Sequence, residues 1–222
     1  MSSDYISLCS WYEDSPRSSR FWQIIDPLER IAALFVVVAT SPLWLAAALS
    51  IVVSSRRSPF IAHRRIGRMG RPLWVLKLRT MWTVDQPRGF ALVERIIQEA
   101  PVYRSKPATD PRVGNAFAAF CRRYSIDELP QLWQVVLGDM ALIGPRPLTE
   151  GELRSHYSAT ARDLLTRKPG ITGLWQIRGR SSLSYRQRQR LDLFLHRRWS
   201  MRLYLRIVFA TIPAVLSGRN AW

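Results

Sequence analysis

The sequence contains few of the residues that build disulfide-stapled domains or zinc sites. Two of its 222 residues are cysteine and three are histidine. Cys9 and Cys121 lie far apart and match no metal-ligand spacing, so the sequence predicts neither a disulfide scaffold nor a zinc site. His63, His156 and His196 show no ligand or triad spacing, and we expect them to be incidental. A reducing cytoplasmic setting fits this composition.

Lysine and acidic residues are also scarce. Three residues are lysine, so 30 of the 33 basic residues are arginine, against 16 acidic residues, and the formal charge is +17. This charge implies an anionic partner, either nucleic acid, anionic lipid or a phosphorylated substrate. Arginine favours phosphate because its planar fork binds two phosphate oxygens at once. A GC-rich genome that encodes arginine in place of lysine accounts for the same surplus equally well.

One long stretch lacks charge altogether. Residues 31–53 are mostly apolar and carry no formal charge, and 23 residues suffice to span the hydrocarbon core of a bilayer as a helix. Thr40, Ser41 and Pro42 interrupt this stretch. Pro42 leaves the carbonyl of Val38 without its helical donor, and we expect the hydroxyls of Thr40 and Ser41 to satisfy the freed carbonyls.

Arginines flank the apolar stretch on both sides. Because positively charged flanks stay in the cytoplasm, a helix that enters the bilayer, breaks at Ser41-Pro42 and returns suits both ends. We therefore predict a re-entrant membrane segment over residues 21–56. A kinked transmembrane helix and a buried core helix remain as alternatives. The flanking residues are Arg17, Arg20, Arg30, Arg56, Arg57, Arg64, Arg65 and Arg68.

The rest of the chain predicts a fold that is mainly α with a small β element (α+β). Apolar periodicity and breakers predict a strand over 73–79, helices over 91–100, 116–123, 129–137 and 185–206, and a loop over 168–173. The basic, aromatic-rich C-terminal helices fit a membrane interface, although ordinary surface helices show the same pattern. The predicted organisation is a polar tail, the membrane segment, a cytoplasmic catalytic domain and interfacial helices, over 1–20, 21–56, 57–184 and 185–222.

Asp127 and Glu128 are adjacent acids in a strongly basic neighbourhood. Ser125 and Glu128 match a capping box, which is a purely structural explanation of the pair. At a helix N-terminus, however, two carboxylates near exposed N–H groups also suit metal–phosphate binding. Mg²⁺ commonly takes one or two carboxylates together with substrate phosphates. A carboxylate can also attack phosphorus to form an acyl phosphate.

Basic residues surround this acidic pair. Pro145 and Pro147 fix two φ angles around Arg146, which presents its guanidinium to a phosphate or simply forms a rigid loop. Further phosphate-binding candidates flank the pair or alternate along the predicted strand: Arg122, Arg123, Lys77 and Arg79.

Several longer segments closely resemble the bacterial sugar transferases. These are monotopic polyprenyl-phosphate hexose-1-phosphate transferases, also called phosphoglycosyl transferases. The similarity runs in the same order from about Phe21 to the C-terminus. It is carried by residues 65–67, 77–81, 110–112, 127–133, 138–140, 142–147 and 168–173.

The resemblance implies a specific reaction. Such enzymes move a sugar-1-phosphate from a UDP-sugar to undecaprenyl phosphate at the cytoplasmic face of the bacterial inner membrane, and they release UMP. By the resemblance, Asp127 is the nucleophile and Glu128 its partner at a Mg²⁺ site. Arg122 and Arg146 resemble the phosphate-binding arginines of the family.

The resemblance also bears on the membrane segment and on specificity. Family members carry a re-entrant helix broken at Ser-Pro, which fits Ser41-Pro42. Departures from the usual pattern put the choice of sugar in more doubt than activity, since none removes a charged catalytic group. They are Leu78, His63, Gln134 and Ala141.

Two other functions remain open. A direct glycosyltransferase would pass the sugar without its phosphate and release UDP. A non-catalytic binder of nucleic acid or anionic lipid suits the charge, but gives no role to the acidic pair or the broken apolar stretch. We expect membrane lipids as partners and no nucleic acid, and leave the sugar, the pathway and a homodimer open.

Overall fold

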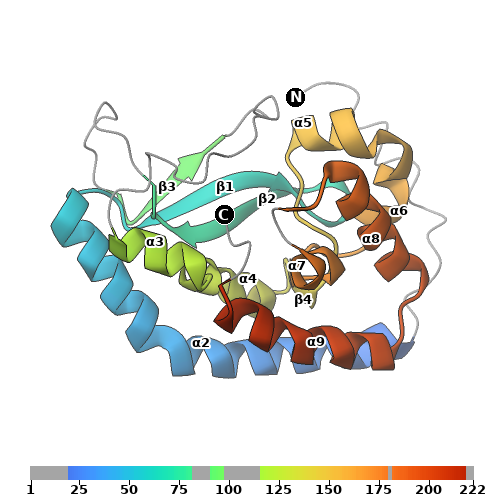
Figure 1. Cartoon of the computed structure of the whole chain (residues 1–222), viewed down its shortest axis with the longest axis horizontal. Coiled ribbons are helices and arrows are strands. Elements are labelled where there is room, and N and C mark those ends of the chain that lie inside the picture. The colour runs from blue at the N-terminus through green and yellow to red at the C-terminus, as the bar shows by residue number, and fades with distance from the viewer. Residues whose placement is uncertain (1–19, 82–90, 98–115, 180–181, 219–222) are drawn as a thin grey trace.

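The computed structural model describes residues 20–81, 91–97, 116–179 and 182–218 (Figure 1). Residues 1–19 of the predicted polar tail lie outside these ranges, and so do residues 110–112, one of the segments that carry the family resemblance. The described chain is mainly helical with two small sheets, in agreement with the predicted fold that is mainly α with a small β element.

A single long helix, α2 (Arg20–Ser55), holds the whole apolar stretch and continues through Pro42. Figure 1 shows α2 bent near its middle, so the predicted break is a bend within a continuous helix. The hydroxyl of Ser41 donates to the carbonyl of Val38 at 2.8 Å, and that of Thr40 to Val36 at 2.7 Å. The prediction is confirmed for Ser41, which bonds the Val38 carbonyl that Pro42 frees, whereas Thr40 bonds the Val36 carbonyl, which Pro42 does not free.

The helix α2 buries three alanines together with Ile25, Val37 and Ile51, and it exposes many large apolar side chains. Ala33, Ala47 and Ala48 face the protein, whereas Ile31 is 67% and Phe35 74% exposed. Beside its first half lies α9 (Met201–Leu216), which likewise exposes Phe209 and other apolar side chains (Figure 1). We call this exposed surface of α2 and α9 the apolar base. Such a surface marks a membrane or protein contact rather than a water-facing side.

Length and composition agree with a membrane contact. In the described part of the chain, the one helix that is long and apolar enough to cross a bilayer is Trp22–Ser55. It is mostly unburied by the rest of the protein.

A three-stranded sheet lies above these helices. β1 (Phe60–Ile66) and β2 (Pro72–Leu78) form an antiparallel hairpin through the 3₁₀ turn η1 (Arg68–Gly70), and β3 (Val93–Ile96) pairs with β1 in parallel. The strand predicted at 73–79 is confirmed. The helix predicted at 91–100 is wrong over the described residues 91–97, because the backbone of β3 pairs with the edge of β1, and such pairing overrides weak local helix propensity.

The acidic pair lies in a short turn on α2. α3 (Ala116–Arg123) confirms the predicted helix, and the 3₁₀ turn η2 (Ile126–Gln131) and α4 (Leu132–Leu137) follow it. Ser125 adopts φ +56° and its side chain makes no capping hydrogen bond, so the predicted capping box is wrong. Lys77 takes the Glu128 carboxylate instead. The helix ends at Gly138, where φ is +88°.

The part of α2 after the bend, which we call its second arm, packs directly against η2. Ala47, Ala48 and Ile51 form one buried cluster with Cys121 and Ile126. In the part of α2 before the bend, its first arm, Ala33 and Val37 pack against β2 and α4. The bent helix therefore carries the segment that holds Asp127.

A second, two-stranded parallel sheet joins β4 (Ala141–Ile143) and β5 (Gly170–Thr172). The loop predicted at 168–173 thus contains a strand, because its backbone pairs with β4. Gly144 and Gly170 approach so closely that a Cβ on Gly144 would lie 2.6 Å from the Gly170 nitrogen. Between the strands run α5 (Glu150–Glu152), the π-helical turn η3 (Leu153–Tyr157), the 3₁₀ turn η4 (Ser158–Thr160) and α6 (Ala161–Leu165).

The C-terminal helices predicted over 185–222 are present, but the segment predicted to be helical over 185–206 is interrupted between two helices. After α7 (Leu174–Arg178), α8 (Tyr185–Arg197) begins at a capping box formed by Ser184 and Gln187. Ser200 then adopts an extended backbone and caps α9 through the amide of Leu203. The cap at Ser200 begins a new helix and so interrupts the helical segment predicted over 185–206.

Candidate active site

Asp127 lies in η2 and is 7% exposed. Three charged side chains act on it: Lys77 from β2, Glu128 from the same turn, and Arg122 from the end of α3. The Lys77 ammonium lies 2.6 Å from Glu128 Oε1. The structure therefore brings four of the predicted site residues together.

Burial decides the electrostatics of this group. It raises the pKa of Asp127 to about 6, while Lys77 and Arg122 act in the opposite direction and Glu128 adds to the rise. A buried carboxylate has little hydration to lose and is held ionised by two cations. Perturbed acids of this kind are enriched at functional sites.

Arg122 has an unused donor beside Asp127. Its Nε is buried and has no hydrogen-bond partner among the residues that the structure describes. A buried donor without an acceptor is costly, so it suits an anionic ligand that completes the site.

Arg79 is engaged elsewhere. Its guanidinium is 3% exposed, pairs with the Glu94 carboxylate and donates through Nε to the Ser58 carbonyl at 2.9 Å. These contacts join β3 to the start of β1. The role of Arg79 as a phosphate ligand stays a prediction. Its buried ion pair with Glu94 argues against that role.

Arg146 belongs to a second cluster. Its guanidinium lies 3.7 Å from Glu152 and stacks over the Trp175 ring at 5.1 Å. The Tyr185 hydroxyl donates to Glu152 at 3.0 Å, and Arg65 adds charge from the end of β1. We call Arg146, Glu152, Tyr185, Arg65 and the nearby Arg188 the Arg146 cluster.

Backbone contacts hold the Arg146 loop, residues 144–147. The Gly144 amide donates to the Thr172 carbonyl at 3.0 Å, and the Gly170 amide donates to Pro145 at 2.9 Å. Pro145 and Pro147 flank Arg146 with trans peptide bonds. The predicted rigid loop is present, and its rigidity comes from both the prolines and the β5 backbone.

One sheet face connects the two groups of charges. Lys77 lies opposite Ile61, and His63 and Arg65 follow on the same face of β1. We call Lys77, His63 and Arg65 the strand row. Burial, followed by the charges of Arg65, Lys77 and Arg79, lowers the pKa of His63 to about 4, so its imidazole is neutral near pH 7.

The strand row shows what sequence reasoning missed. His63 Nδ1 is buried without a hydrogen-bond partner among the described side chains and main chain. We expected His63 to be incidental, and the structure places it between two cations instead. The sequence contained one indication of this position: His63 and Arg65 alternate in a segment that pairs with the strand of Lys77.

The donor set can be tested against Mg²⁺. No group of three or more His, Cys, Asp or Glu side chains that could hold a metal occurs within the described ranges. Asp127 and Glu128 supply two neighbouring carboxylates, which suit Mg²⁺ when substrate phosphates provide the remaining ligands. The nearby cations Lys77 and Arg122 are compatible with those phosphates.

The arrangement as a whole suits chemistry at phosphorus. It combines a buried carboxylate, cations that neutralise phosphate oxygens, and a row of donors that leads to a second arginine cluster.

Known proteins resemble this chain over most of its length. A family model described as bacterial sugar transferase matches residues 21–218. The exopolysaccharide production protein ExoY of Sinorhizobium fredii is 38% identical over 204 residues, which cover 86% of this chain and 85% of that protein.

Two further relatives carry names that describe a reaction. The UDP-glucose:undecaprenyl-phosphate glucose-1-phosphate transferase of Caulobacter vibrioides is 34% identical, over 88% of this chain and 70% of that protein. The undecaprenyl-phosphate galactose phosphotransferase of Salmonella typhimurium is 33% identical, over 93% of this chain and 43% of that protein.

Proposed function

Because the chain belongs to the bacterial sugar transferase family, we propose that it transfers a hexose-1-phosphate from a UDP-sugar to undecaprenyl phosphate and releases UMP. The observation that carries this proposal is the buried Asp127 carboxylate between Lys77 and Arg122. The names of the Caulobacter and Salmonella relatives support the two substrates, and the ExoY relative supports a role in exopolysaccharide synthesis.

In the first step, a carboxylate oxygen of Asp127 attacks the β-phosphorus of the UDP-sugar. The bond from this phosphorus to the bridging oxygen breaks, UMP leaves, and the sugar phosphate remains on Asp127 as an acyl phosphate. Lys77 keeps Asp127 ionised and, with Arg122, neutralises charge on the phosphate oxygens.

In the second step, a phosphate oxygen of undecaprenyl phosphate attacks the phosphorus held on Asp127. The bond between phosphorus and the carboxylate oxygen breaks, which yields the lipid diphosphate sugar and restores Asp127. A covalent intermediate suits this pair of substrates because one is soluble and the other is held in the membrane.

Asp127 and Glu128 are the residues that would hold Mg²⁺. When bound, the ion neutralises phosphate charge and orients the phosphate oxygens. Lys77 fixes the Glu128 carboxylate through its 2.6 Å ion pair and so sets the side of η2 on which phosphate binds.

The strand row gives the donor a direction. Ile61, opposite Lys77, and Arg65 are four positions apart along β1, which is about 13 Å along a strand. A UDP-sugar that lies along this row places its diphosphate beside Asp127 and one of its ends beside Arg65 and Arg146. Neutral His63 then meets an uncharged polar part of the donor.

We place α2 in the cytoplasmic leaflet as a re-entrant helix. Three features support this placement: arginines at both ends of the apolar stretch, the Ser41 hydrogen bond that accommodates Pro42, and the apolar base beside α9. The site then faces the cytoplasm, where UDP-sugars are available.

The test uses the full chain in lipid nanodiscs with Mg²⁺, one UDP-sugar at a time and undecaprenyl phosphate. We expect repeated turnover, measured as UMP release, to require the lipid phosphate. When the lipid is omitted, we expect at most one equivalent of UMP per protein and an intact-protein mass increase of one hexose phosphate. Release of UDP would indicate a direct glycosyltransferase instead. An adduct that persists in Asp127→Asn would contradict the nucleophile assignment.

A further inference from the structure

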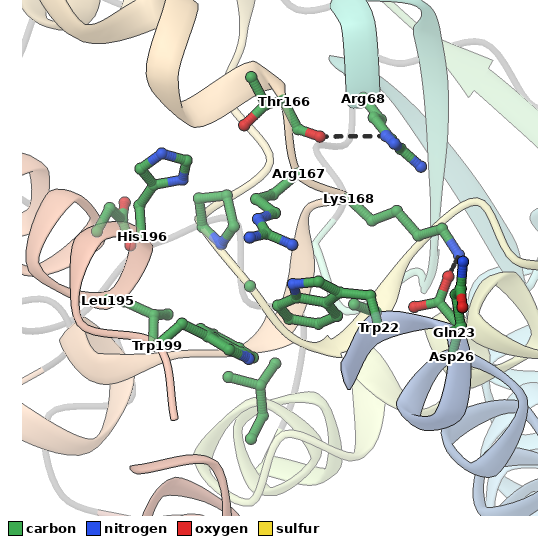
Figure 2. A pocket seen from close by; sticks show the side chains of 15 residues that line it. Trp22, Gln23, Asp26, Arg68, Thr166, Arg167, Lys168, Leu195, His196 and Trp199 are labelled. Atoms are coloured by element: carbon green, nitrogen blue, oxygen red, sulfur yellow. Dashed lines mark hydrogen bonds and ion pairs between the residues drawn. The ribbon is translucent and has the colours of Figure 1, made fainter. Parts of the chain in front are cut away.

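A pocket separate from Asp127 lies at one end of the apolar base. Its volume is about 190 Å³, and it is lined by the start of α2, the η1 turn, the loop after β4, residues 166–168 and α8. Figure 2 shows Trp22 and Trp199 at its lower side, with Arg68, Arg167 and Lys168 above and beside them.

The cations of this pocket are only partly paired. Lys168 is paired with Asp26 at 2.6 Å, and Arg68 Nε donates to the Thr166 carbonyl at 3.1 Å. Arg167 lies over the Trp22 ring at 4.3 Å. Within the described residues, neither Arg68 nor Arg167 forms an ion pair with a carboxylate.

The two guanidinium groups also repel each other. Burial lowers the pKa of Arg167, and the charge of Arg68 lowers it further. Like charges held together in a partly buried pocket are stabilised by an anion that both can bind. Arginine forks are well suited to phosphate for this purpose.

The remaining titratable groups leave the pocket positive. Asp26 is already paired with Lys168, and burial raises the pKa of Asp192 to about 7, so that near neutral pH much of it is uncharged. Burial and then the charge of Arg167 lower the pKa of His196, whose Nδ1 has no hydrogen-bond partner among the described residues. Arg146 and Arg188 face Asp192 from the other side.

The surroundings of the pocket fit the surface of a bilayer. Trp22 and Trp199 lie with ring centroids 4.5 Å apart, at the points where α2 and α9 begin. Tryptophan is enriched at the headgroup level of membranes. The pocket thus lies at the end of the apolar base, among aromatic and basic side chains.

The pocket is remote from the reacting carboxylate. Asp26 lines the pocket, whereas Ile126 beside Asp127 packs with Trp44 and Ile51 of the second arm. About 27 Å of helix axis separates Asp26 from Trp44. Asp127, Glu128, Lys77 and Arg122 do not line the pocket, so the two sites are formed by different side chains.

We propose that this pocket binds the phosphodiester headgroup of an anionic glycerophospholipid, with Arg68 and Arg167 as phosphate ligands and Trp22 and Trp199 beside its glycerol and upper acyl chains. The bound lipid fixes the end of the apolar base at the membrane surface. This lipid is not consumed by the transfer reaction, and the site is distinct from that of the polyprenyl acceptor.

Native mass spectrometry of the detergent-solubilised full chain tests this inference. Phosphatidylglycerol, phosphatidylcholine and undecaprenyl phosphate are each titrated into wild type, Arg167→Gln, Arg68→Gln and Arg190→Gln. Arg190 is the matched control because it is exposed on α8 and does not line the pocket. Thermal unfolding of each variant confirms that it is folded.

We expect phosphatidylglycerol to bind in preference to phosphatidylcholine, and either pocket variant to weaken it about tenfold, as expected for the loss of a charge-assisted hydrogen bond. Arg190→Gln should bind as wild type does. Equal binding of phosphatidylcholine, or wild-type binding by both pocket variants, would overturn the proposal. So would displacement of the lipid by millimolar inorganic phosphate, or loss of undecaprenyl phosphate binding alone in Arg167→Gln. The measurement needs no UDP-sugar, so its failure leaves the transfer reaction untouched.

Discussion

Asp127 and Glu152 are almost equally buried, at 7% and 8% exposure, and yet their acidities change in opposite directions. Burial raises the pKa of both carboxyls. Glu152 faces Arg146 and accepts hydrogen bonds from the Thr149 amide and the Tyr185 hydroxyl, and its pKa ends below the usual range. Asp127 has cations nearby but fewer donors, and its pKa ends above the usual range. Partners, rather than depth, therefore set the acidity of each group.

The comparison separates two roles. Glu152 accepts hydrogen bonds from the Thr149 amide at the cap of α5 and from the Tyr185 hydroxyl of α8, and it forms an ion pair with Arg146. This suits a residue that holds other side chains in place. Asp127, the proposed nucleophile, has neighbouring cations that compensate its charge but fewer hydrogen-bond donors. Substitutions in each cluster should therefore fail in different ways.

Asp127→Asn should have the largest effect. The amide keeps the size of the side chain but cannot form an acyl phosphate, so we expect UMP release to fall by more than about 1,000-fold. Binding of the UDP-sugar, measured by equilibrium dialysis, should change by only a few-fold. Asp139→Asn is the control, because Asp139 is an exposed acid after α4. Turnover within tenfold of wild type would contradict the covalent mechanism.

Glu152→Gln should have an intermediate effect. It removes the charge that faces Arg146 and weakens the hydrogen bonds from Thr149 and Tyr185. We expect kcat/KM to fall about 10- to 100-fold and the free energy of unfolding to fall by about 1–3 kcal/mol. Glu150→Gln, which alters an exposed pair with Arg154, should leave both close to wild type. If the two variants behaved alike, Glu152 would have no positioning role.

His63→Leu should have a smaller effect, confined to binding. Leucine fills the same space but offers no hydrogen bond, so we expect KM for the UDP-sugar to rise about five- to tenfold with little change in kcat. His63→Gln restores a polar side chain and should recover most of the loss. An unchanged KM in His63→Leu would mean that the donor does not lie along the strand row.

Asp192→Asn should change stability rather than turnover. The pKa of Asp192 is about 7 in the folded protein, above its unfolded value, so the unfolded state releases its proton first as pH rises. Between about pH 4 and 7 this lowers the free energy of unfolding of the wild type by at most about 1.4 kcal/mol per pH unit.

Asparagine has no such dependence. The melting temperature of Asp192→Asn relative to wild type should therefore be higher at pH 8 than at pH 5. Thermal unfolding in detergent at both pH values measures this difference. A constant difference would show that Asp192 titrates normally in the folded protein.

Local patterns predicted the part of the site built from neighbouring segments. The helix at 116–123 and the strand at 73–79 appeared where expected, and they bring Arg122 and Lys77 to Asp127. The Ser41 hydroxyl was also predictable, because Pro42 frees one particular carbonyl. These features depend on a few residues of local sequence or on the resemblance of whole motifs.

Contacts between distant segments could not be predicted in the same way. Arg146 meets Tyr185 and Asp192 only because α8 folds back over the Arg146 loop. A domain limit at residue 184 therefore divides side chains that act together, and it stays a prediction. Similarly, β3 formed because the edge of β1 was available, which no property of residues 91–97 reveals.

The small-residue face of α2 also sets an order of assembly. η2 and α4 pack on Ala33, Ala47 and Ala48, a surface that exists only once α2 is helical. The opposite face of α2 carries large apolar side chains that need a membrane or protein contact to cover them. Since α2 precedes η2 in the chain, it leaves the ribosome earlier and can insert first. If α2 inserts as proposed, the bilayer acts as a template, and we expect Asp127 to reach its final position only in molecules that have already bound the membrane.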